Sequence, residues 1–408
     1  MIGALILLLV LYGVTQAIFS GLQKRHRFFS APFMNKLFWY HLFFGLVYYA
    51  YASFNASDSH RYFERTSMHQ GSWGELFGTS TTFIDFMAYP LIHYLGFNYE
   101  MMMLFFVWLG FLGFLYAYLF FRENIPIKVK VFKRWDFLTL ILFLPNMHFW
   151  TASLGKGAPI FFGLMLFTYA IKAPNQRLFS LVLGSFVIYF IRPHVFFFVA
   201  VGTVIGYMFG RERISMAQKL FITAGLITVL ILAKDQILAM GGIDGSNDLL
   251  TDFQAFSSDR SQELGKSGSG VSMSSYPLPL KLFTFWYRPL FIDAPGVLGL
   301  IVSFENLLYL LLTFKLFQRG IFKFLRKSPM MVKMSLVVFF LSSLAMTFIM
   351  SNLGIIMRQK SMVMYFLFFV IYYYLAQKKY VKLKRMKKIR EAALREKQQQ
   401  EAATVATA

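Results

Sequence analysis

The feature that most constrains this chain is a series of apolar runs that recur along almost its whole length. The runs are about 16 to 23 residues long, close to the ~20 residues that a helix needs to cross a bilayer. A closed β-barrel is the other structure that spans membranes, and its strands alternate apolar and polar residues. The runs here are apolar at both alternating positions. The sequence therefore predicts an all-α membrane protein.

About eleven runs qualify as candidate spans, which predicts a polytopic transmembrane helical bundle. The composition agrees, because 57% of the residues are hydrophobic and only 15% are charged, unlike an average soluble domain. The first run lacks a basic flank and a cleavage site, so we expect a retained helix and not a signal peptide. The candidate spans are 2–20, 36–53, 99–121, 137–152, 157–172, 178–191, 195–210, 218–234, 290–316, 332–351 and 361–377.

Basic residues collect in alternate connections between the runs, as they do on the cytoplasmic side of membrane proteins. This pattern predicts an N-terminus outside, a C-terminus inside, a single transmembrane domain over 1–377 and a basic cytoplasmic tail over 378–408. It explains the net charge of +22 without a nucleic-acid partner. The predicted cytoplasmic groups are Lys24, Arg25 and Arg27; Arg122, Lys128, Lys130, Lys133 and Arg134; Lys172 and Arg177; Arg211, Arg213 and Lys219; Arg319, Lys323, Arg326, Lys327 and Lys333; and the ten Lys or Arg residues between Lys378 and Lys397.

The remaining connections, which we expect to face the exterior, carry little net charge but contain Asp, His, Trp and Pro. The stretch 241–275 is rich in Gly, Ser and Asp, which predicts a mobile loop able to order over a substrate. The chain has no Cys, which excludes disulfides and thiolate metal sites. The predicted outer connections are 54–98, 155–157, 192–194, 235–289 and 352–360.

The first outer connection opens with SDSHRYFERT, residues 57 to 66, next to the predicted membrane surface. Partial desolvation there can raise the pKa of Asp58 or Glu64 toward the range of a general base. Flanking Arg61 and Arg65 oppose this by favouring the ionised carboxylate, and the alternative is a solvated loop with local ion pairs. A carboxylate that acts as a general base needs no cofactor and no metal, although Asp58 and Glu64 could together bind a divalent metal.

Four basic residues come from four separate further outer connections: Lys156, Arg192, Arg288 and Arg358. Arg192 stands with His194 at a Pro break inside a long apolar stretch, where ionisable residues are functional candidates. The alternatives are that Lys156 extends to lipid headgroups and that the break is a simple turn. Arg binds phosphate through two hydrogen bonds and stays protonated. Together these residues predict one phosphate- or pyrophosphate-binding site on the outer face.

Several motifs resemble those of known families. Asp58-Ser59, with a Tyr four residues after Asp58, is similar to the start of the first large outer loop in the GT-C superfamily of polyprenyl-dependent glycosyltransferases. The segments PNMHFWTASLGKG, RPH, YRPLFIDAP followed by FEN, and NLGIIMRQK resemble bacterial proteins of O-antigen or exopolysaccharide polymerisation. In GT-C enzymes the catalytic loop follows the first span, whereas here it follows the second. The resemblance implies a catalytic role for Asp58 and a substrate site made of Lys156, Arg192, His194, Arg288 and Arg358.

These observations predict a multi-pass enzyme of the bacterial inner membrane that transfers a sugar from a polyprenyl-phosphate or pyrophosphate donor. Its partners would be the lipid bilayer and the polyprenyl-linked sugar. Asp58 would accept the proton of the acceptor hydroxyl, while Arg192 and Arg358 would stabilise the departing phosphate together with Arg288. Two alternatives stay open. A transporter or flippase for an anionic lipid or solute would use the same basic residues, and a non-catalytic scaffold would use its outer loops to bind other proteins.

Overall fold

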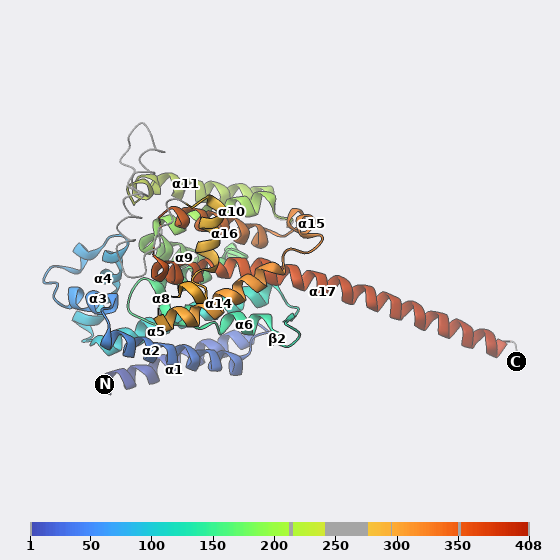
Figure 1. Cartoon of the computed structure of the whole chain (residues 1–408), viewed down its shortest axis with the longest axis horizontal. Helices are drawn as coiled ribbons and strands as arrows, with labels where there is room; N and C mark the ends of the chain where they lie inside the picture. The colour runs from blue at the N-terminus through green and yellow to red at the C-terminus, as the bar shows by residue number, and fades with distance from the viewer. Residues whose placement is uncertain (1, 212–214, 241–275, 295, 350–351, 407–408) are drawn as a thin grey trace.

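The structure is a computed structural model that describes residues 2–211, 215–240, 276–294, 296–349 and 352–406 (Figure 1). These residues are almost entirely helical, which confirms the predicted all-α class. Within the described ranges the only strands are β1 (Lys130–Val131) and β2 (Trp135–Asp136), which form one short antiparallel pair. The helices are α1 (Ile2–Arg25), α2 (Ala31–Phe54), α3 (Asp58–Ser67), α4 (Thr81–Tyr89), α5 (Tyr99–Asn124), α6 (Phe137–Leu142), α7 (Pro145–Trp150), α8 (Gly157–Ala170), α9 (Leu178–Ile191), α10 (Pro193–Phe209), α11 (Met216–Met240), α13 (Leu278–Tyr287), α14 (Gly296–Phe314), α15 (Ile321–Arg326), α16 (Met330–Ile349) and α17 (Leu353–Ala406).

Five of the described helices are long and apolar enough to cross a membrane, namely α1, α5, α14, α16 and the first part of α17. The chain is therefore a membrane protein. Shorter apolar helices accompany them: the α6–α7 segment, α8, α9, α10 and the first half of α11. Helix α2 has 24 residues but contains four Tyr, one Trp and one His besides Asn35 and Lys36, which lowers its hydropathy. The count of about eleven spans remains a prediction.

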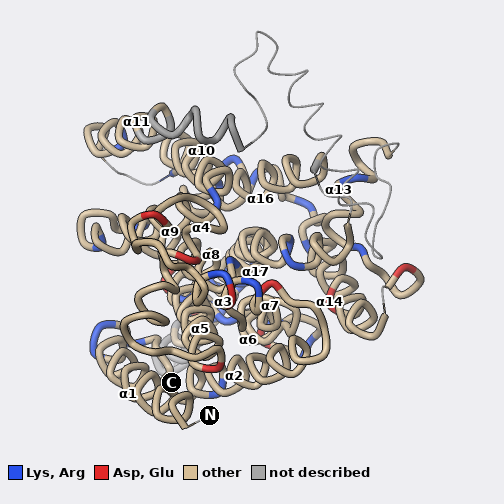
Figure 2. Tube along the Cα trace, turned by 90° about the vertical axis from the view of Figure 1, so that its left-hand side faces the viewer, with Lys and Arg blue, Asp and Glu red and all other residues tan. Residues whose placement is uncertain are grey.

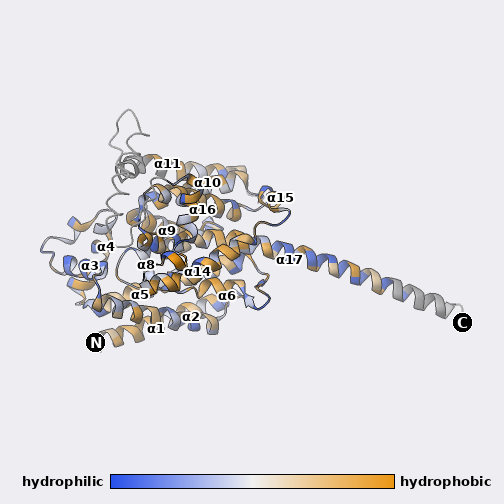
Figure 3. Cartoon of the chain, in the orientation of Figure 1, coloured by the Kyte–Doolittle hydropathy of each residue, from blue (hydrophilic) through white to orange (hydrophobic). Residues whose placement is uncertain are grey.

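The two ends of the bundle differ in what they carry (Figure 1). The N-terminus lies at the same end as α3 and α4, which we call the loop end. The opposite end, called the tail end, holds the β1–β2 pair and α15, and from it α17 projects as a single helix. Lys379 Nζ donates there to the Lys128 carbonyl at 2.8 Å, and Lys378 Nζ to Gln318 Oε1 at 2.6 Å. Figure 3 shows more hydrophilic residues along the coloured projecting part of α17 than in the bundle, which is mostly hydrophobic.

Helix α5 lies in the centre of the bundle, since 78% of its apolar stretch is buried against 17% for α1. It packs on α8, which packs on α9, while α10 packs on α16. Glycines allow the close approach of these helices, as is common in membrane bundles. A Cβ placed on Gly184 of α9 would lie 2.8 Å from the backbone nitrogen of Phe167 in α8. The site described below is built on this rigid centre.

Several segments differ from their predicted form. The connection 54–98 is not an open loop, because it contains α3, α4 and two short helical turns. The predicted turn 352–360 lies largely within α17, so Arg358 and Lys360 are helical. The predicted span 137–152 is two short helices, because Pro145 starts a new helix after the chain breaks at 143–144. The mobile loop predicted over 241–275 lies outside the described residues.

Candidate functional site

Helix α3 is held at the loop end by an ion pair with α4 whose carboxylate is buried and whose guanidinium is half-exposed. Arg65 donates twice to Asp85, at 2.7 Å through Nε and at 2.8 Å through Nη2, and Thr66 Oγ1 donates to the same carboxylate at 3.2 Å. Asp85 is only 2% exposed. Arg65 thus forms an ion pair, but not a local one with Asp58, because its partner is 20 residues later in the chain. This pairing neutralises Arg65 and fixes α3 over the bundle.

Asp58 at the start of α3 pairs with Arg358 of α17. Arg358 Nη1 donates to Asp58 Oδ2 at 3.1 Å, joining residues that are 300 positions apart in the sequence. The Asp58 side chain is half-exposed, whereas that of Arg358 is mostly buried. The Arg358 guanidinium also lies over the Trp150 ring, 5.7 Å from its centre, and its buried Nε has no hydrogen-bond partner among the described residues. Arg358 therefore retains an unused donor.

Lys156 lies beside this pair, at the turn before α8. Its Nζ donates to Ser80 Oγ at 2.7 Å. Burial is the largest cause that lowers the pKa of Lys156, to about 8, and the nearby charges of Arg192 and Arg358 lower it further. A lysine that reached lipid headgroups would not be held in this way. Ser80 has a φ of +66°, an uncommon value for a residue other than glycine.

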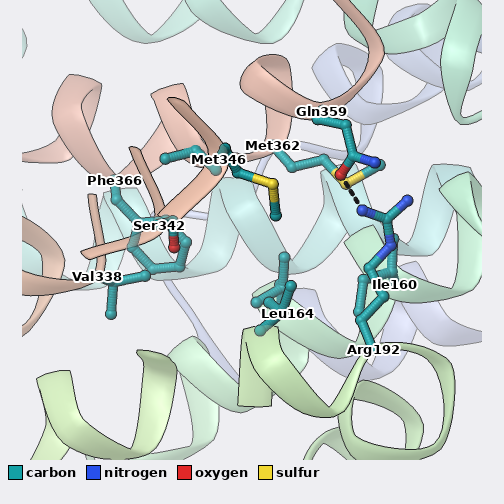
Figure 4. Close-up of a pocket in the computed structure, with 11 residues that line it drawn as sticks. Ile160, Leu164, Arg192, Val338, Ser342, Met346, Gln359, Met362 and Phe366 are labelled. Carbon is teal, nitrogen blue, oxygen red and sulfur yellow. Dashed lines mark hydrogen bonds between the residues drawn. The ribbon is translucent and has the colours of Figure 1, made fainter. Parts of the chain in front are cut away.

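Arg192 lies deeper, at the break between α9 and α10. It is 8% exposed, and its Nη1 donates to Gln359 Oε1 of α17. Figure 4 shows Arg192 and Gln359 together beside a pocket whose other walls are mostly apolar side chains of α8, α16 and α17. Burial and the neighbouring Arg358 lower the pKa of Arg192 to about 10. Among the described residues no carboxylate lies within ion-pair distance of Arg192.

Tyr62 is a member of this group that sequence reasoning did not single out as a site residue. It is 7% exposed, and burial raises the pKa of its hydroxyl, which hydrogen-bonds to the Thr81 side chain. The charges of Asp58 and Arg358 also act on this hydroxyl. Its position four residues after Asp58 places both side chains on one face of α3, and this spacing was the available signal.

His194 and Arg288 complete the set of predicted residues, with different outcomes. His194 lies on the first turn of α10, within electrostatic range of Arg192 and Lys156. Arg288 stands apart, because it pairs with Asp293 five residues later. The Arg288 carbonyl accepts a hydrogen bond from Lys360 Nζ at 2.5 Å. The structure thus brings together Asp58, Lys156, Arg192, His194 and Arg358, and leaves Arg288 in a neighbouring polar group.

The break between α6 and α7 exposes backbone groups inside the bundle, and side chains of α2, α7, α14 and α17 satisfy them. This accounts for many of the buried polar residues without invoking a ligand. His148 also contacts His41 through their Nδ1 atoms at 2.9 Å. The backbone partners are Tyr365 OH with the Ile141 carbonyl (3.0 Å), His148 Nε2 with the Leu142 carbonyl (2.7 Å), Tyr40 OH with the Phe143 carbonyl (2.9 Å), and Glu305 Oε2 with the Asn146 N–H (2.9 Å).

The group at the loop end has an excess of positive charge. We call Lys156, Arg192 and Arg358 the cation cluster; they come from three separate elements, and the only carboxylate in contact with them among the described residues is Asp58. Figure 2, which views the molecule from the loop end, shows basic and acidic segments side by side among α3, α7 and α17. Buried cations in such excess favour an anionic ligand with several oxygen acceptors. In the described part of the chain, no three His, Asp or Glu side chains are grouped as metal ligands.

Comparisons of the chain with protein-family models, with curated proteins and with solved structures found no match. The chemistry of the site therefore has to be inferred from its own residues.

Proposed function

We propose that this chain is an envelope glycosyltransferase or polysaccharide polymerase of the bacterial inner membrane, acting on a polyprenyl-phosphate or pyrophosphate-linked sugar. The observation that supports this most is the cation cluster, in which three cations from separate elements lie together at the loop end and, among the described residues, only Arg358 pairs with a carboxylate. Phosphate oxygens are the acceptors that Arg and Lys bind best in such a position. The apolar surroundings suit a ligand whose other part is a lipid chain.

The proposed reaction uses the cation cluster and Asp58 in different roles. Arg192 and Lys156 hold the phosphate group of the donor, and Arg358 joins them as negative charge grows on the leaving oxygen. The acceptor hydroxyl attacks the anomeric carbon, the bond from that carbon to the phosphate oxygen breaks, and the Asp58 carboxylate accepts the hydroxyl proton. Asp58 suits this role because its half-exposed side chain is accessible to an acceptor from outside the bundle.

The proposal includes a topology of about eleven spans, with the loop end and N-terminus outside and the tail end in the cytoplasm. Helices α8 and α9 have 14 residues each and cover about 21 Å, which is shorter than the hydrocarbon core. They span the bilayer only with the help of the turns at their ends. This arrangement would place Lys156 and Arg192 at the level of the phosphate groups of the outer leaflet.

Charge removal within the site tests the proposal. Arg358→Ala and Asp58→Asn are expected to accumulate in the membrane like the parent but to lower glycan output about 100-fold, because each removes a group that acts on the reacting atoms. Arg358→Lys restores only part of the output, since Lys lacks the two-pronged geometry of Arg. Output is measured with a lipid-linked sugar in membranes that contain the purified chain.

The matched control is Arg61→Gln, which removes the same charge from an exposed position of α3 and should leave output unchanged. Variants that fail to accumulate would identify the Asp58–Arg358 pair as structural. Variants that accumulate and keep full output would eliminate glycosyl transfer and favour transport of an anionic lipid or solute.

A further inference from the structure

Arg358 pairs with the Asp58 carboxylate and also lies near two other cations, Lys156 and Arg192. Its Nη1 donates to Asp58 at 3.1 Å, and its charge also acts on Lys156 and Arg192. Its Nε is buried without a hydrogen-bond partner among the described residues. A buried N–H group is costly to leave unpaired, so the guanidinium is placed to donate to a further oxygen, supplied by a ligand.

The Asp58 carboxylate and a bound anion would compete for Arg358, and the anion would bind it more strongly. The carboxylate of Asp58 is half-exposed, and an ion pair that shares its charge with water contributes little to stability. An anion between Lys156 and Arg192 would be attracted by all three cations in a more buried place, where charges interact more strongly. Such an anion is therefore expected to take Arg358 from Asp58.

We propose that Arg358 exchanges partners when the donor binds, leaving Asp58 for the ligand phosphate and thereby freeing the Asp58 carboxylate to accept a proton. This inference rests on the proposed function and adds an order of events to it. Without a donor, Arg358 holds the carboxylate in an ion pair. With the donor bound, the same carboxylate faces the acceptor hydroxyl unpaired, so the base becomes available only when the phosphate is in place.

A double-mutant cycle on ligand binding tests the exchange without requiring activity. Inorganic pyrophosphate is titrated calorimetrically into the purified full-length chain in detergent, for the parent, Asp58→Asn, Arg358→Gln and the double variant. Asp58→Asn should bind pyrophosphate about 5-fold more tightly than the parent, because Arg358 no longer has to leave a carboxylate. In the Arg358→Gln background the same Asp58→Asn change should alter affinity by less than about 2-fold.

Glu64→Gln is the control, because Glu64 is exposed on the same helix and loses the same charge. It should change affinity by less than about 2-fold, and thermal unfolding of each variant shows whether the fold is kept. An equal gain from Asp58→Asn with and without Arg358 would overturn the exchange, since Asp58 would then act by general repulsion alone. No gain would overturn it as well. If pyrophosphate fails to bind the parent, the anion site and with it the proposed function are wrong.

Discussion

Lys156 combines a positive charge with a site that has little access to water. Its Nζ donates to Ser80, while Arg192 and Arg358 lie close enough to disfavour its protonation. Among the charges that act on Lys156, Asp58 favours the protonated form. Arg65, although paired with Asp85, disfavours it. A cation kept in such surroundings costs stability, and such a cost is common where a residue is held for a ligand.

The pH dependence of stability follows from this cost. The pKa of Lys156 is lowered to about 8, so between about 8 and the usual 10.5 the unfolded chain binds more protons than the folded one. The free energy of unfolding should therefore rise with pH across this window, and the full cost of Lys156 applies below pH 8. Lys156→Met should raise the thermal midpoint at pH 7 by roughly 2 °C, with a smaller gain at pH 9. A gain that is equal at both pH values would contradict the assignment.

Ligand binding should show the opposite trend with pH. Because Lys156 attracts an anion only when protonated, the affinity for pyrophosphate should fall as pH rises through about 8. Lys156→Arg keeps the charge at higher pH, so its affinity should stay level between pH 7 and 9. Calorimetric titration at several pH values measures both. A fall of the same size in Lys156→Arg would assign the titration to another group.

At the scale of the elements, helix α3 is fixed to α4 by a group of hydrogen bonds on one carboxylate. Asp85 accepts three hydrogen bonds from Arg65 and Thr66, and these tie α3 to α4. Asp85→Ala leaves Arg65 without its partner and should lower the free energy of unfolding by about 2 kcal/mol. Glycan output should fall as well, since α3 carries Asp58, the proposed base. Glu75→Ala, at an exposed carboxylate in the same connection, is the control, and proteolysis of the 54–98 segment detects local release of α3.

The break between α6 and α7 leads to a prediction about helix packing. Tyr365→Phe removes the hydroxyl that pairs with the Ile141 carbonyl at 3.0 Å and should cost roughly 0.6 kcal/mol, the usual value for such bonds in membrane bundles. Tyr380→Phe, at an exposed position of the α17 tail, should cost nothing measurable. Unfolding in mixed detergent compares the two. If Tyr365→Phe lowered the free energy of unfolding as much as a cavity in the core does, the hydroxyl would have a role beyond its hydrogen bond to one carbonyl.

At the scale of the whole molecule, the helical class and the grouping of five predicted site residues follow from patterns that the sequence displays. Long apolar runs predict helices directly. Basic residues in the connections between them predict which connections lie at the same end of the bundle. Pairings across long separations have no such signal, so Arg65 with Asp85 and His41 with His148 were not foreseen. Arg288 did not join the cluster because Asp293, five residues later, gives it a local partner. The α6–α7 break was missed because Pro145 sits inside a continuous apolar run.

The sidedness of the molecule is the last prediction, and the absence of Cys makes it testable by single-cysteine labelling. A membrane-impermeant maleimide added to intact cells should modify Ala56→Cys, which lies next to α3 at the loop end, and should spare Ala392→Cys, at an exposed position of the tail, until the membrane is opened. The physical reason is the positive-inside bias, because the tail carries ten Lys or Arg between Lys378 and Lys397 while the loop end carries few uncompensated cations outside the cluster.

A reporter active only outside the cytoplasm should likewise be silent when fused after Lys379. Labelling of Ala392→Cys in intact cells would reverse the orientation and place the cation cluster in the cytoplasmic leaflet, where the proposed outer-leaflet donor is absent.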